Sequence, residues 1–134
     1  MTRQMGRVAA AATIVVLASL ACGGSFSTAN IGEAWLATDA EGGNRTTTFS
    51  QDATLNLFVR LNNAPDDTAL KVSWLAVDAE GMAANTLIYE TEFTSGDDVV
   101  RFYVTNEDLW PIGAYKADVY LNGEFNRSLA FEVR

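Results

Sequence analysis

The sequence predicts an all-β domain, a seven-stranded antiparallel β-sandwich, preceded by a cleaved N-terminal signal segment. Two patterns support this fold class. Beyond about residue 29, apolar and polar residues alternate with the period of 2 that half-buried strands show, and helical periodicity is nearly absent. Clusters of Gly, Pro, Asn and Asp separate the alternating segments at nearly even spacing, as turns between short strands do.

Seven segments carry the alternation. In one of them Leu55, Leu57 and Val59 lie on one face, with Asn56 and Phe58 on the other. Asn122-Gly123, flanked by two such segments, is the strongest hairpin signal in the chain. The expected strands are residues 31–38, 53–62, 69–78, 86–93, 99–105, 113–121 and 124–133.

Two aromatic residues predict which kind of sandwich these strands form. Trp74 is central in the third expected strand, where immunoglobulin-type sandwiches bury a tryptophan. Tyr115 stands at the start of the sixth, in the place of a tyrosine corner, whose hydroxyl bonds back to the preceding backbone. Both residues are therefore expected in the core of an immunoglobulin-like sandwich.

A resemblance points the same way. The stretch Trp110-Pro-x-Gly-x-Tyr, continued by Val119-Tyr-Leu-Asn-Gly, is similar to the last hairpin of small immunoglobulin-like modules in bacterial surface and envelope lipoproteins. The resemblance implies a scaffold and an exported location. It supplies no catalytic residues.

The N-terminal segment has the layout of an export signal. Arg3 and Arg7 form a basic start, and an apolar run, residues 8–21, follows and ends at Cys22, the single cysteine. The run is shorter than the roughly 20 apolar residues that a membrane-spanning helix needs. An ordinary secretory leader, cut after a nearby alanine, would leave Cys22 as a free thiol outside the cytosol, which is a liability.

The residues before Cys22, ending in Ala21, resemble the lipobox of bacterial lipoproteins, which implies cleavage before Cys22 and lipidation of its thiol. The expected domains are a signal peptide (1–21), a lipidated cysteine with a flexible tether (22–28) and the sandwich (29–134). The protein is then expected at the cell envelope, anchored to the membrane through Cys22, in the outer membrane if the host has one.

Charge and composition exclude several classes of function. The chain has nine basic and 17 acidic residues and a net charge of −8, and two of the basic residues lie in the leader. Such a domain repels phosphate backbones, so nucleic acid is not an expected partner. The chain contains no histidine, and its one cysteine is the anchor, which removes the commonest general base and thiolate metal sites.

Carboxylates remain as candidates for chemistry. Pairs such as Asp66-Asp67 and Asp97-Asp98 could contribute to a calcium site or to a glycosidase-type pair. None has the Asp-x-Asp-x-Asp-Gly spacing of a dedicated calcium loop. We therefore expect solvated acidic turns, no metal, no cofactor and no enzymatic activity.

Outward aromatic residues are the remaining candidates for a binding face. Three aromatic residues share the predicted solvent-facing side of their strands with polar residues: Phe58, Tyr103 and Tyr120. Leu75 is expected on the same sheet as Tyr120. The expected function is a non-catalytic binding or structural module with a protein or glycan partner. Two alternatives are an envelope inhibitor or chaperone that pairs through a strand edge, such as the first or fourth strand, and a carbohydrate-binding module.

Overall fold

The computed structural model describes residues 28–134, so the signal segment and Cys22 lie outside the described residues. The described chain forms strands only, and it therefore contains no helix long and apolar enough to cross a membrane. Its strands are β1 (Asn30–Ala37), β2 (Thr48–Phe49), β3 (Leu55–Asn62), β4 (Thr68–Ala79), β5 (Thr86–Ser95), β6 (Val99–Val104), β7 (Gly113–Leu121) and β8 (Glu124–Val133).

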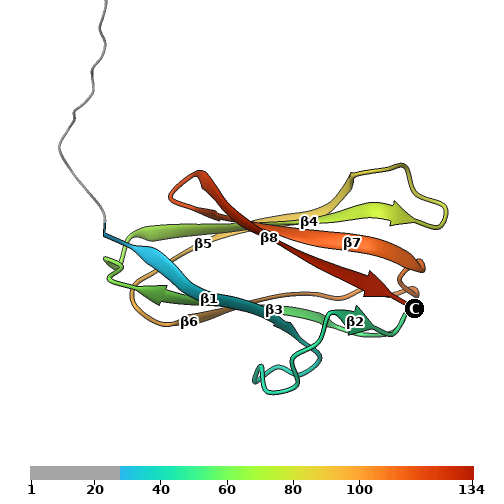
Figure 1. Ribbon diagram of the computed structural model, residues 1–134, viewed down its shortest axis with the longest axis horizontal. Coiled ribbons are helices and arrows are strands. Elements are labelled where there is room, and N and C mark those ends of the chain that lie inside the picture. Colours follow the sequence, from blue (N-terminus) through green and yellow to red (C-terminus); the bar gives the residue numbers. More distant parts are fainter. Residues whose placement is uncertain (1–27) are drawn as a thin grey trace, which may run out of the picture.

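The strands form two packed sheets (Figure 1). One sheet has three strands in the order β1-β3-β6, and the other has five in the order β2-β8-β7-β4-β5. The prediction of an all-β, two-sheet sandwich is confirmed. All seven expected strands are present, and none of their ends is shifted by more than two residues.

The eighth strand, β2, is absent from the sequence prediction. It has two residues and pairs in parallel with β8, so the sandwich is not wholly antiparallel. Its Phe49 is buried and packs edge-on against Phe131 at 5.5 Å. A two-residue strand has no measurable alternation, and only its partner in the other half of the chain defines it.

The core lies between the sheets and is built around aromatic residues. Trp74 and Tyr115 are each 1% exposed, and both pack on Phe131. The Tyr115 hydroxyl donates a hydrogen bond to the Pro111 carbonyl oxygen at 2.5 Å, the geometry of a tyrosine corner. Trp110 closes one end of the core, and its indole N–H donates to the Ala53 carbonyl at 2.8 Å.

Candidate functional site

The two sheets differ in width, and the difference leaves one side of the sandwich open. Tyr89 and Phe93 of β5 pair with Trp74 and Leu70 of β4, so all four side chains leave the larger sheet on its inner face. Trp74 and Leu70 are almost fully buried, whereas Tyr89 is 48% and Phe93 is 54% exposed. The inner face of β5 therefore extends beyond the cover that the three-stranded sheet provides.

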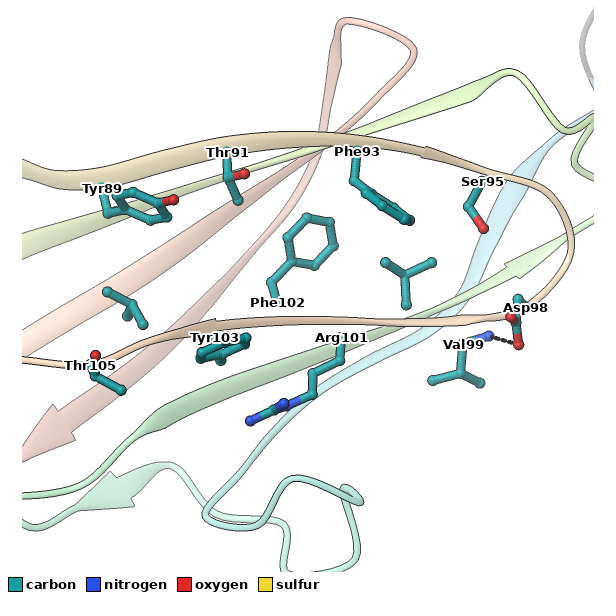
Figure 2. Close-up of a pocket in the computed structure, with 12 residues that line it drawn as sticks. Tyr89, Thr91, Phe93, Ser95, Asp98, Val99, Arg101, Phe102, Tyr103 and Thr105 are labelled. Atoms are coloured by element: carbon teal, nitrogen blue, oxygen red, sulfur yellow. Dashed lines mark hydrogen bonds between the residues drawn. The ribbon is translucent and has the colours of Figure 1, made fainter.

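A groove of about 780 Å³ fills this open side, lined by β5 and β6. Figure 2 shows Tyr89, Thr91 and Phe93 pointing from β5 toward β6, and Phe102 pointing back from β6 into the space between them. Phe102 is 4% exposed and forms an apolar floor. The connection 96–98 joins the two strands and closes one end of the groove.

The β6 edge that borders the groove is unpaired. The Leu61 N–H donates to the Asp98 carbonyl at 2.9 Å, which fixes the hydrogen-bonding phase of the antiparallel β3–β6 pair. Hydrogen-bonded positions alternate along such a pair, so the backbone of every second β6 residue turns toward β3. The N–H and C=O groups of Arg101 and Tyr103 therefore face the open side.

The edge of β6 also lacks the features that usually protect edge strands. Its sequence, Val-Val-Arg-Phe-Tyr-Val, consists of strong strand formers and contains no proline. The one charged side chain, Arg101, is held against the outer face of the sheet. Its Nε donates to Asn56 Oδ1 at 2.9 Å, and its guanidinium lies 4.2 Å from the centre of the Tyr103 ring.

Tyr103 is the expected binding-face residue that borders the groove, and it is 55% exposed. Tyr120 and Leu75 both face outward from the larger sheet, but they are not adjacent. Leu75 pairs with Lys116, four residues from Tyr120, which is about 13 Å along the strand. The contacts of Tyr120 are instead Lys71, whose Nζ is 4.4 Å from the ring centre, and Phe125.

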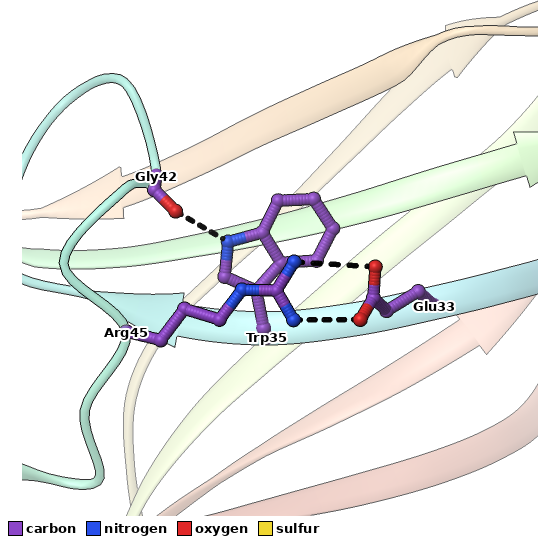
Figure 3. A network of polar contacts seen from close by, with 4 residues as sticks. All are labelled: Glu33, Trp35, Gly42 and Arg45. Carbon is purple, nitrogen blue, oxygen red and sulfur yellow. Dashed lines mark hydrogen bonds and ion pairs between the residues drawn. The ribbon is translucent and has the colours of Figure 1, made fainter.

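Phe58 has the outward parity expected from the sequence, but it is 4% exposed and offers no binding surface. Trp35 stacks on it, with 5.5 Å between the ring centres. The Trp35 indole N–H donates to the Gly42 carbonyl oxygen at 3.0 Å (Figure 3). The Arg45 guanidinium covers the Trp35 ring at 4.2 Å and makes two hydrogen bonds to Glu33. The outer aromatic pair on this sheet is therefore covered.

The Glu33–Arg45 ion pair at 2.6 Å accounts for the pKa shifts in this cluster. The hydrogen bonds from Arg45 lower the pKa of Glu33 below its ordinary value, and the same bonds raise the pKa of Arg45. Both side chains are about half exposed to solvent, so the pair contributes little to the stability of the fold. Its geometric effect is to hold the Arg45 side chain over the indole.

Acidic side chains gather at the closed end of the groove, without forming a metal site. Within residues 28–134, no group of three carboxylates converges closely enough to hold a metal ion. Asp97 Oδ1 accepts a hydrogen bond from the Ala64 N–H, and Asp98 Oδ1 accepts one from the Val99 N–H at 2.7 Å. Asp66, in the connection between β3 and β4, has its carboxylate beside Gly96 of the 96–98 turn. This end of the groove is consequently negative.

Tyr89 and Phe93 are the groove residues that the sequence analysis missed. Tyr89, Thr91 and Phe93 stand two residues apart and therefore share one face of the fourth expected strand, and that alternation is present in the sequence. The same alternation equally fits core residues. Only the widths of the two sheets show that this face is uncovered.

Solved structures share the fold. An immunoglobulin-like protein from Pseudomonas aeruginosa is similar with a TM-score of 0.54 and 16% identity, over 83% of this chain and 100% of that one. A β-glucosidase from Listeria innocua in complex with glucose has a TM-score of 0.56 and 17% identity, over 84% of this chain and 17% of the glucosidase chain. An alkylpurine DNA glycosylase from Pseudomonas fluorescens, bound to DNA with an abasic site analogue, has a TM-score of 0.54 and 18% identity, over 81% of this chain and 31% of the glycosylase chain.

These likenesses show an immunoglobulin-like fold. This chain spans less than a third of the glycosylase chain and a sixth of the glucosidase chain, so in both enzymes the shared fold is one part of a larger protein. No family model matches the sequence. No curated protein matches it either.

Proposed function

We propose that the chain is an exported lipoprotein of the cell envelope, anchored through a lipid on Cys22, whose immunoglobulin-like domain is a non-catalytic binding module. The groove between β5 and β6 is the observation that carries the binding role. Exposed aromatic residues beside unpaired backbone groups are typical of surfaces that bind a partner. The basic start, the short apolar run and the lone Cys22 support the anchor.

The groove chemistry supports binding without catalysis. A glycosidase-type mechanism needs two carboxyl groups on either side of the scissile bond. Asp98 is the one carboxylate among the residues that line the groove, and it accepts the Val99 N–H at the closed end. The remaining lining is apolar, aromatic or hydroxylic, with Arg101 turned away in Figure 2.

Fractionation of cells tests the anchor. A Cys22→Ser chain should lose incorporation of labelled fatty acid and leave the membrane fraction, because no thiol remains to acylate. A Ser25→Ala chain is the matched control and should stay with the membrane. Persistence of the Cys22→Ser chain in the membrane fraction would contradict the anchor.

Site-specific crosslinking tests the binding role. A photo-reactive amino acid replaces Phe93 in the groove, or Leu87, which lies on the same strand with its side chain on the outer face. The two residues are 54% and 53% exposed, so the comparison is matched for accessibility. In intact cells a discrete adduct should form from position 93 and not from position 87. Equal labelling from both positions would refute the groove as the binding surface.

A glycan ligand is the second candidate, because exposed tyrosines at a groove can stack on sugar rings. Tyr89 and Tyr103 are the residues that favour it. A glycan array probed with the full chain separates the two functions. Binding to a defined glycan that is lost in Tyr89→Ala would establish the sugar site, and silence across a broad array would remove it.

A further inference from the structure

The groove has the shape and chemistry of a place for one missing strand. Resting on the proposed binding function, we propose that it captures a single extended segment of a partner protein, which pairs with β6. The segment carries apolar side chains at alternate positions and a Lys or Arg where it meets the 96–98 turn. In effect, the captured segment would become the fourth strand of the smaller sheet.

Backbone groups supply the first part of the recognition. The hydrogen-bonding phase of β3 and β6 turns the N–H and C=O of Arg101 and Tyr103 to the open side. The Val99 N–H has the same orientation and is already bonded to Asp98 Oδ1. An added strand would therefore pair along the Arg101–Tyr103 part of the edge, as in other cases of strand addition.

Side chains supply the second part. Tyr89 and Phe93 of β5 face the space beside β6, and Phe102 lies between them from the other side (Figure 2). Every second side chain of an added strand would point into this space, at intervals of about 7 Å. Burying apolar side chains there would remove the exposed faces of Tyr89 and Phe93 from water.

Charge supplies the third part. Asp66, Asp97 and Asp98 stand at the closed end of the groove, within a chain of net charge −8. A cationic side chain at that end of the segment would be attracted, and an anionic one repelled. The predicted segment is therefore asymmetric, with its basic residue at the 96–98 end.

The position of β5 favours one captured strand over a second copy of the domain. Two copies that paired β6 to antiparallel β6 would be related by an axis perpendicular to the sheet. That axis would place both β5 strands on the same side, in the space that each β5 already faces. A single extended segment needs only the space between β5 and β6.

A synthetic peptide tests the proposal with the purified full chain in detergent. The probe is a fluorescein-labelled peptide of about ten residues, within the usual length of strands, with alternating valine and threonine and two lysines at one end. A peptide of the same composition with its valines in one block is the control. Fluorescence anisotropy should rise with the alternating peptide and stay flat with the blocked one.

Two pairs of variants locate the binding. Tyr103→Pro removes the open-side N–H without touching the bonds to β3, and Tyr103→Thr keeps that N–H. The proline should weaken peptide binding about tenfold or more, and the threonine should stay within a few-fold of the parent. Phe93→Ala should weaken binding as well, while Leu87→Ala, on the outer face of the same strand, should not. This second pair avoids any effect of proline on folding.

Three results would overturn the proposal. The first is equal binding to the Tyr103→Pro and Tyr103→Thr chains, and the second is equal loss from Phe93→Ala and Leu87→Ala. The third is a dimer of the chain, seen in sedimentation, that the Tyr103→Pro substitution abolishes but that added peptide does not dissociate. The groove would then be an interface between two copies of the chain. A Cys22→Ser chain should bind the peptide like the parent, so a failure of the anchor and a failure of strand capture are read separately.

Discussion

The hydroxyl of Tyr115 should stabilise the connection between β6 and β7, and removing that one oxygen should lower the free energy of unfolding by a measurable amount. Tyr115 is 1% exposed, burial raises the pKa of its hydroxyl, and that hydroxyl donates to the Pro111 carbonyl. Tyr115→Phe deletes the bond and keeps the ring on Phe131, where the two planes lie 13° apart. The net loss of a hydrogen bond costs about 0.5–1.5 kcal/mol, and an unpaired buried carbonyl costs about 1–3 kcal/mol.

Pro111 is half-buried, so water can recover part of the lost bond. We therefore expect a loss of about 1–2 kcal/mol, from a total that is typically about 5–15 kcal/mol. Urea unfolding, followed by tryptophan fluorescence, measures this loss in the free energy of unfolding. The dependence of that free energy on urea concentration should be unchanged if the transition stays two-state. Tyr103→Phe is the control, since within residues 28–134 the exposed Tyr103 hydroxyl has no hydrogen-bond partner. Equal stability of the two variants would refute the corner as a stabilising contact.

Three further predictions concern the core and the turns. Trp74→Ala should lower the free energy of unfolding by about 3–5 kcal/mol, and a variant that unfolds like the parent would contradict its place in the core. Gly113→Ala should cost about 2 kcal/mol or more, because φ is +155° and a Cβ would collide with the Asp78 carbonyl oxygen. Gly123→Ala, at φ +84° with open space around it, should cost less in the same urea experiment. Hydrogen bonds from the backbone N–H groups of Asn44 and Gly43 lower the pKa of Asp39. Its contribution to the free energy of unfolding is therefore present above about pH 4 and is lost as the pH falls through the lowered pKa. The free energy of unfolding of Asp39→Asn should therefore be closer to that of the parent in acid than at neutral pH.

The alternating segments made the strands predictable, because each segment is long enough for one face to differ clearly from the other. Trp74 and Tyr115 also lie where the sequence analysis expected them. The strand β2 was not predictable, since its identity depends on a parallel partner more than 80 residues away in the chain. Local alternation contains no information about such a pairing.

The candidate site was predicted less well, for a related reason. Parity assigns a side chain to a face, but it does not say what covers that face. Phe58 faces outward and is still buried, because Trp35 stacks on it and the Gly42 turn lies against both rings. Tyr89 and Phe93 face inward and are still exposed, because the opposite sheet is narrower. Both outcomes depend on tertiary packing that the period of 2 does not encode.

Amide hydrogen exchange along β6 is the most direct test of the unpaired edge and of strand capture. In the free chain, the N–H groups of Val100, Phe102 and Val104 should exchange slowly, because they bond to β3, while those of Arg101 and Tyr103 should exchange fast. With the alternating peptide at saturation, Arg101 and Tyr103 should become protected and the other three should change little. Slow exchange at Arg101 and Tyr103 in the free chain, or fast exchange that the bound peptide leaves unaltered, would contradict the account.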